Sequence, residues 1–236
     1  MSKAEELADK TADAIREMVP KFKVIKKTDS WFHRTVGAIL KPINDGYMKR
    51  YYTTIGYTVA LPEGMEILPW ATAWHEGGHA WQAKKYSRLL FGALYLMGTP
   101  VWLVFAALTC WPFFVWLPWW SGVIWLTLFT LLSFPPFGFL RAHWEFEMYG
   151  LSMAVRIWSG ETLDDAYIER RSKEFTGSFY FWMAPYPSYV KKKLKKYRED
   201  SSSGEIFKRG AAKYYKHAYA TMKTLGLVTN PPTVEP

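Results

Sequence analysis

The stretch that most constrains this chain is residues 69–88, which read PWATAWHEGGHAWQAKKYSR. Proline is favoured at the first position of a helix, so Pro69 predicts a helix that begins there and runs to about Arg88. His75 and His79 are four residues apart and therefore lie on one face of this helix, where both imidazoles can reach a single metal ion. The spacing predicts a metal site rather than two unrelated histidines.

Glu76 follows the first histidine and completes the pattern H-E-x-x-H. Zinc lowers the pKa of a bound water towards about 7, and a glutamate at this position can take the proton as the water attacks a carbonyl. Gly77 and Gly78 stand in the middle of the helix, where each costs up to about 1 kcal/mol relative to alanine. They indicate a helix that must leave space above a metal or let another backbone approach closely.

A catalytic zinc ion needs a third protein ligand and an open position. No third histidine follows at the longer spacing H-E-x-x-H-x-x-G-x-x-H, and the best source of a ligand is residues 141–150, RAHWEFEMYG, which we expect on another helix. Glu145 and Glu147 point about 200° apart there, so one of them can face the metal. We expect Glu147, because Arg141 can pair with Glu145 four residues later. Glu145 and His143 are the alternatives, and His143 could instead support a ligand or bind the transition state.

Residues 89–140 contain no Asp, Glu, Lys or Arg. A helix that spans a membrane needs about 20 apolar residues, so this block is long enough for two. Its middle, residues 111–120, holds two prolines and four tryptophans, and proline breaks helices while tryptophan prefers the bilayer interface. We expect a helical hairpin in the membrane with arms at about 89–110 and 121–138. A re-entrant hairpin that never crosses is the alternative.

The 30 basic and 21 acidic residues give a net charge of +9. Fourteen Lys and Arg residues precede residue 89 and sixteen follow residue 140, so basic segments flank the apolar block on both sides. This distribution favours a lipid bilayer as partner over nucleic acid, and the positive-inside rule places both termini in the cytoplasm. The basic run at residues 191–198 suits either a solvated helix face or anionic headgroups.

The fold class we expect is α+β and mostly helical, with a hydrophobic helical hairpin inserted between two helices that carry metal ligands. Residues 51–61 are rich in aromatic and β-branched types, residues 62–64 suit a turn and residues 65–68 a return strand, which together predict a small β-hairpin or sheet. We divide the chain into a basic helical region (1–50), the hairpin with the H-E-x-x-H helix (51–88), the membrane hairpin (89–140), a second ligand helix with a basic helix (141–200), and a C-terminal helix and tail (201–236). The single cysteine, Cys110, excludes an intrachain disulfide and a cysteine-type zinc site.

His75-Glu76-Gly77-Gly78-His79, followed by Glu145-Phe146-Glu147-Met148 on a later helix, resembles the gluzincin branch of zincin-like metallopeptidases. The resemblance covers about residues 50–88 and 139–158. It implies a zincin-like helix pair, a Zn²⁺ ion, and a glutamate ligand from the second helix, which it assigns to Glu147. The apolar insertion between the motifs is similar to that of membrane-bound relatives.

The sequence therefore predicts a membrane-associated zinc metallopeptidase that cleaves a peptide or protein near the bilayer, with Glu76 as general base. Tyr149, Tyr180 and His143 are the candidates for stabilising the oxyanion. One alternative is a non-enzymatic membrane-inserting structural or assembly protein, such as a phage virion component, that retains a metallopeptidase-like fold. Another is a basic membrane-surface or nucleic-acid-binding module in which the motif is accidental.

Overall fold

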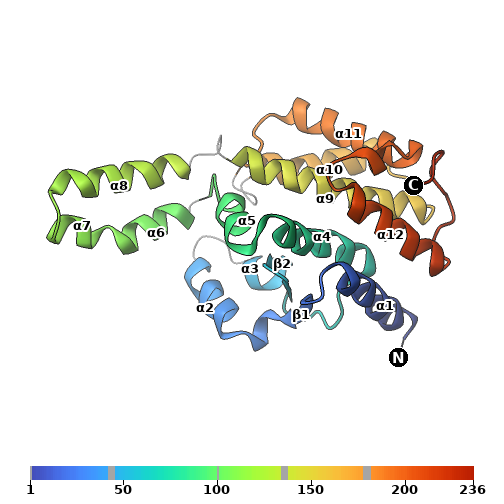
Figure 1. The fold of residues 1–236 in the computed structure, drawn as a ribbon, viewed down its shortest axis with the longest axis horizontal. Helices are drawn as coiled ribbons and strands as arrows, with labels where there is room; N and C mark the ends of the chain where they lie inside the picture. Colours follow the sequence, from blue (N-terminus) through green and yellow to red (C-terminus); the bar gives the residue numbers. More distant parts are fainter. Residues whose placement is uncertain (1, 42–45, 100, 134–137, 178–181) are drawn as a thin grey trace. The chain divides into compact units, whose positions relative to one another are not determined.

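The computed structural model describes residues 2–41, 46–99, 101–133, 138–177 and 182–236. These residues form a mostly helical protein with one small three-stranded sheet, which confirms the predicted α+β class (Figure 1). The chain divides into two compact units, Met1–Phe91 with Met148–Thr162 and Arg198–Pro236, and Gly92–Glu147 with Leu163–Tyr197. Helices α5 (Arg88–Tyr95), α9 (Phe139–Trp158) and α11 (Pro187–Ser203) each have one end in the first unit and the other end in the second.

The first unit opens with a helix that the sequence caps well. The Ser2 hydroxyl accepts a hydrogen bond from the Glu5 amide, and the Glu5 carboxylate accepts one from the Ser2 amide, which is a capping box at the start of α1 (Lys3–Met18). The other elements that lie in or begin in this unit are α2 (Trp31–Leu40), α3 (Gly46–Lys49), α4 (Trp70–Tyr86), α5 (Arg88–Tyr95), η4 (Glu205–Lys208) and α12 (Ala212–Thr224), besides α1 (Lys3–Met18) and a short helix at Lys27–Asp29. The expected single C-terminal helix is thus two segments, η4 and α12.

The sheet has the strand order β1-β3-β2. Strands β2 (Thr53–Ile55) and β3 (Thr58–Leu61) form an antiparallel hairpin within the segment expected to be β-rich, but it turns at Gly56, with a φ of 61° that glycine tolerates, and not at residues 62–64. Strand β1 (Lys23–Lys26) pairs with β3 in parallel and was not predicted. The return strand expected at residues 65–68 is wrong, because that segment has no strand structure and leads directly into α4.

Large aromatic side chains fill the core of the first unit. Trp74, Trp158, Tyr214 and Tyr219 are at most 2% exposed. The Trp158 ring packs edge-on against Tyr219, and its indole nitrogen donates to the Ser201 carbonyl at 3.2 Å. The ring of Trp74, on α4, packs edge-on against Tyr214 of α12. This contact holds the helix that carries the two histidines against α12.

The second unit contains the charge-free block and two further helices. The block forms α6 (Val101–Thr109), α7 (Trp111–Val115) and α8 (Trp119–Leu132), and the unit continues with the first turns of α9 (Phe139–Trp158), with α10 (Asp165–Thr176) and with most of α11 (Pro187–Ser203). Asp164 caps α10 by accepting from the Tyr167 amide at 2.7 Å. Phe146 of α9 stacks on Phe175 of α10 and also touches Tyr189 of α11.

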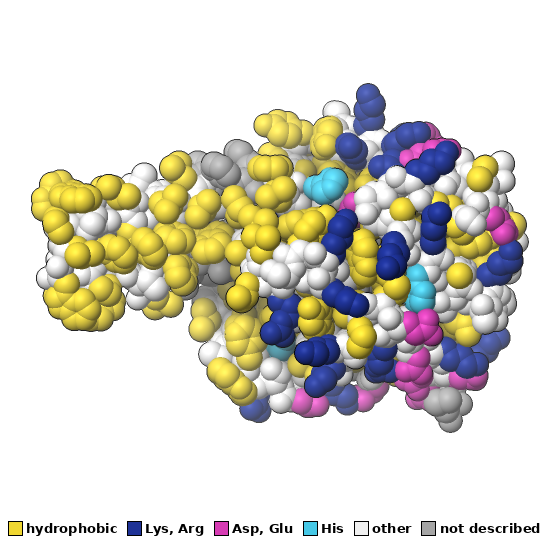
Figure 2. Space-filling view, in the orientation of Figure 1, with side chains coloured by type: hydrophobic (Ala, Val, Ile, Leu, Met, Phe, Trp, Pro, Cys, Tyr) yellow, Lys and Arg dark blue, Asp and Glu magenta, His cyan; other side chains and the backbone are white. Residues whose placement is uncertain are grey.

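Helices α6 and α8 lie side by side, joined by α7, as the expected hairpin requires (Figure 1). Trp125, Phe129 and Phe105 pack against one another between the two helices. The exposed surface is rich in large apolar side chains: Leu108 is 71% exposed and Trp116 72%. Figure 2 shows hydrophobic side chains over most of the visible face of this segment and no charged ones. The described helices include none that is both long and apolar enough to cross a bilayer. The arms also differ from the expected ranges, since α5 ends at Tyr95 and a turn at Gly98, with a φ of 75°, precedes α6.

Candidate metal centre

Helix α4 presents the H-E-x-x-H motif as the sequence predicts. It extends over Trp70–Tyr86, with Pro69 at its N-cap. His75 and His79 lie one above the other on it, with ring centroids 5.0 Å apart. His79 is 4% exposed and His75 is half-buried. Two imidazoles therefore face the same small region, on the side of α4 that packs against α9.

The two glycines of the motif allow neighbouring side chains to pack tightly on α4. A Cβ built on Gly78 would lie 1.9 Å from the sulfur of Met148 on α9, and one on Gly77 would lie 2.6 Å from the Tyr214 hydroxyl. Gly77 also receives Ile15 of α1. The expected close approach is thus made by side chains rather than by another backbone, and it brings α9 against the face of α4 that bears the histidines.

Met148 therefore decides which face of α9 meets α4. Residues at i, i+3, i+4 and i+7 share one face of a helix, and Glu145, Met148, Tyr149 and Ser152 have this spacing. Tyr149 packs edge-on against the His75 ring at a centroid distance of 5.0 Å. Because α9 is one continuous helix, its register places Glu145 on this same face, one turn before Tyr149.

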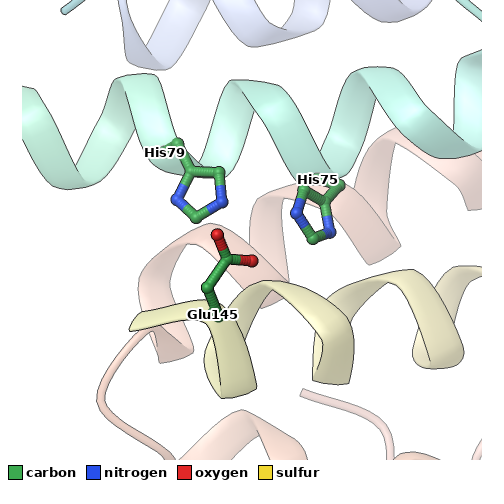
Figure 3. A group of neighbouring side chains, drawn as sticks. All are labelled: His75, His79 and Glu145. Carbon is green, nitrogen blue, oxygen red and sulfur yellow. The ribbon is translucent and has the colours of Figure 1, made fainter. Parts of the chain in front are cut away.

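His75, His79 and Glu145 form a group that could hold a metal ion (Figure 3). One ligand atom from each lies within 4.8 Å of the others, and Figure 3 shows the carboxylate pointing from α9 towards the two rings on α4. A tetrahedral zinc ion with ligands at about 2.0–2.2 Å holds them about 3.3–3.6 Å apart, which small side-chain rotations would reach. Two imidazoles and one carboxylate are also the donor set of a catalytic zinc site, with the fourth position open.

Each imidazole has a hydrogen-bond partner that determines which nitrogen is available to a metal. Ser152 Oγ donates to the Met148 carbonyl, so it accepts from His75 Nδ1, 2.9 Å away. Gln82 Oε1 accepts from His79 Nδ1 at 3.0 Å. In both neutral rings the proton is therefore on Nδ1 and the lone pair on Nε2. Fixing the tautomer and the ring orientation in this way is typical of histidines that bind metals.

Glu145 is oriented by a residue from the helix that leads into the hairpin. The Tyr95 hydroxyl, at the end of α5, donates to the Glu145 carboxylate. The guanidinium of Arg141 lies 5.0 Å from the centre of the Tyr95 ring. Glu145 is 1% exposed, so this hydrogen bond holds a buried carboxylate in a defined orientation. All three candidate ligands thus have a supporting partner.

Glu76 points away from this group, towards the sheet. Its carboxylate accepts a hydrogen bond from Thr54 Oγ1 on β2. Lys27 is fully buried beyond it, donates to the carbonyls of Tyr47 and Tyr51, and is attracted electrostatically to Glu76. Burial lowers the pKa of Lys27 to about 8, and the nearby Glu76 charge opposes this shift. Burial raises the pKa of Tyr52, and the Glu76 carboxylate adds to that shift.

The third ligand is where the structure departs from the sequence-based choice. The group contains Glu145, the alternative, and lacks Glu147, which points about 200° away around α9. Glu147 is 6% exposed and lies 3.9 Å from the imidazole of His143. The His143 side chain is 66% exposed and is outside the group. Of the oxyanion candidates, Tyr149 is beside His75, and Tyr180 lies outside the described residues.

Five residues of this site were not singled out from the sequence: Tyr95, Gln82, Ser152, Thr54 and Lys27. Ser152 could have been found from its spacing of seven from Glu145, once Glu145 is placed towards α4. Nothing in the sequence near Thr54 or Tyr95 indicates the contacts that they make. No family model, no curated protein and no solved structure matches this chain, so the functional argument rests on the site itself.

Proposed function

We propose that this protein is a membrane-associated zinc metallopeptidase in which His75, His79 and Glu145 bind the metal. The observation that carries the proposal is the convergence of these three side chains, each with its own hydrogen-bonding partner. Imidazole nitrogens and carboxylate oxygens are ligand types that Zn²⁺ prefers, and three of them within reach of one point match a catalytic zinc site. A helix that needed only packing would gain nothing from this arrangement.

Bound zinc would supply a water of lowered pKa, about 7, and polarise the carbonyl of a peptide bond. Glu76 is the general base of this proposal. Its helix direction differs by about 100° from that of His75, which makes it unsuitable as a ligand, and to act as the base its side chain turns from Thr54 towards the metal-bound water. Thr54 donates to one Glu76 oxygen and leaves the other able to accept the proton.

The charge-free hairpin α6–α8 is the part of the protein that enters the bilayer. Its exposed surface consists of large apolar side chains with no charge, which water solvates poorly and lipid well. The basic segments on both sides of the hairpin favour a cytoplasmic location for both termini. The substrate is accordingly a peptide or a protein segment close to the membrane.

The test is Glu76→Gln, which keeps size and polarity but removes the proton acceptor. We expect the variant to retain zinc and to lose hydrolysis of a peptide library by at least about 10²-fold, the usual contribution of a general base. Glu63→Gln, an exposed glutamate in the loop before α4, is the matched control and should cleave as the wild type does.

Equal turnover by Glu76→Gln and wild type would show that Glu76 is not the base. Stoichiometric zinc without any hydrolysis in the wild type would favour the alternative, a structural or assembly protein with a metallopeptidase-like site.

A further inference from the structure

Helix α11 carries an exposed face that the proposed hydrolase does not use. The face consists of Tyr186, which directly precedes α11, and of four residues on the helix with the same spacing: Tyr189, Lys192, Lys193 and Lys196. Tyr186 is 69% exposed and Tyr189 50%, values unusual for residues of this size. We call this set the aromatic–basic face.

The opposite side of α11 explains how the helix is held. Val190 and Leu194 are fully buried and Tyr197 is 4% exposed. Lys191 and Lys195 form ion pairs with Glu169 and Asp165 of α10, at 2.6 and 2.7 Å. The buried side chains and these two ion pairs lie on one side of the helix, and the exposed Tyr186, Tyr189 and Lys192 lie on the other.

The aromatic end of this face lies close to the base of the hairpin. Gly138, just before α9, packs against the backbone of Met183: a Cβ on Gly138 would lie 3.3 Å from the Met183 Cα. Phe139 and Trp182, the neighbours of these two residues, are 60% and 49% exposed. Exposed aromatic rings therefore adjoin the contact between the start of α9 and the segment before α11, and the lysines follow along α11.

We propose that the aromatic–basic face, with Phe139 and Trp182, rests on the anionic headgroup surface of the bilayer that the hairpin enters. Tyrosine and tryptophan prefer the membrane–water interface, and lysines near the surface are attracted to anionic lipids. The order of residues, apolar hairpin, then aromatic rings, then lysines, matches the passage from hydrocarbon through interface to headgroups. The inference rests on the proposed membrane association and is independent of zinc and of hydrolysis.

The experiment compares binding of the full-length protein to neutral phosphatidylcholine vesicles and to vesicles that also contain phosphatidylserine. The wild type should bind the anionic vesicles more tightly, and added salt should reduce the difference, because exposed charges are screened. The variant Lys192→Gln/Lys193→Gln/Lys196→Gln should lose the preference by about fivefold per lysine, or about 100-fold in all. Its binding to neutral vesicles should not change.

The matched control is Lys213→Gln/Lys216→Gln/Lys223→Gln, which removes the same charge from exposed positions of α12. Equal losses in the two triple variants would overturn the proposal, because net charge and not the α11 face would then be responsible. A wild type that binds neutral and anionic vesicles equally would overturn it too.

A second pair of variants separates failure of this inference from failure of membrane association. Leu108→Asp/Trp116→Asp on the hairpin should abolish binding to neutral vesicles, whereas Trp31→Asp, equally exposed at 72% on α2, should not. If the wild type binds neither kind of vesicle, the membrane part of the proposed function fails and the inference falls with it.

Discussion

Two imidazoles that both keep their proton on Nδ1 are prepared to bind a cation through Nε2. The hydrogen bonds from His75 to Ser152 and from His79 to Gln82 achieve this before any metal arrives. Tyr95 orients Glu145 in the same way, because its hydroxyl donates to one carboxylate oxygen. Replacing such outer partners typically costs about 10–100-fold in metal affinity, so the support is part of the site.

The choice of the third ligand can be tested by two variants of the same chemical kind. We expect Glu145→Gln to weaken zinc binding by more than about 10–100-fold, because it removes a ligand rather than the partner of one. Glu147→Gln, two residues away on the same helix, should leave the affinity unchanged. Competition with a chelator of known affinity measures both, and the reverse order of effects would restore Glu147 as the ligand.

Buried Lys27 makes the stability of the protein depend on pH in an unusual direction. Its pKa is lowered from 10.5 to about 8 in the folded state, so between these values the unfolded chain carries a proton that the folded chain lacks. The free energy of unfolding contributed by Lys27 therefore rises with pH, by about 2 kcal/mol between pH 7 and 9.5. Urea unfolding at both pH values, compared with Lys27→Met, should show this rise in the wild type alone; an equal pH dependence in both proteins would refute it.

At the residue scale, the sequence predicts the two histidines and Glu76 because all three follow from one local pattern. It does not predict the third ligand, because the face of α9 that meets α4 depends on Met148 fitting against Gly78, a contact between segments 70 residues apart. The structure adds a contact that no local pattern indicates: the hydroxyl of Tyr95, 50 residues away in the chain, donates to the Glu145 carboxylate.

Among the elements, α4 depends most on the absence of side chains at its glycines. We expect Gly77→Ala to lower the free energy of unfolding by about 1–2 kcal/mol, because its Cβ would lie 2.6 Å from the Tyr214 hydroxyl and 2.8 Å from Ile15. Both neighbours are 0% exposed and have no space to move into. The gain in helix propensity offsets this cost only in part.

Gly92→Ala is the control for this substitution. Gly92 is also helical, but a Cβ there would meet nothing within 4 Å, so alanine should stabilise α5 by up to about 1 kcal/mol. Chemical denaturation of both variants gives the comparison. If Gly77→Ala and Gly92→Ala had equal free energies of unfolding, the contacts at Gly77 would not limit the size of the side chain on α4.

The elements that the sequence predicts well are those with strong local patterns. The H-E-x-x-H helix, the β structure within residues 51–61 and the turn of the helical hairpin near residues 111–120 all follow from nearby residues. Strand β1 was missed because KVIK is too short to be distinguished from coil, and it forms through parallel pairing with β3. The strand expected at residues 65–68 failed because two turn residues, Pro62 and Gly64, suit a loop as well as a hairpin.

For the whole molecule, two features of the chain are combined. One is a buried pair of helices that brings His75, His79 and Glu145 together, and the other is an uncharged hairpin that shows large apolar side chains to its surroundings. The 52 consecutive residues without a charge predict the apolar hairpin, and the motif at residues 75–79 predicts the two histidines of the helix pair. The substrate cannot be predicted in this way, because cleavage preference depends on side chains that meet the peptide and that no local pattern identifies.

The central claim is that this chain binds one zinc ion through His75 and His79. The most direct test is the metal content of the purified, zinc-reconstituted protein, measured for the wild type, for His75→Ala/His79→Ala and for the control His143→Ala, whose side chain is largely exposed. We predict one zinc per chain in the wild type and the control, and none in the double variant with its helical content retained. Stoichiometric zinc in the double variant, or none in the wild type, would contradict the claim.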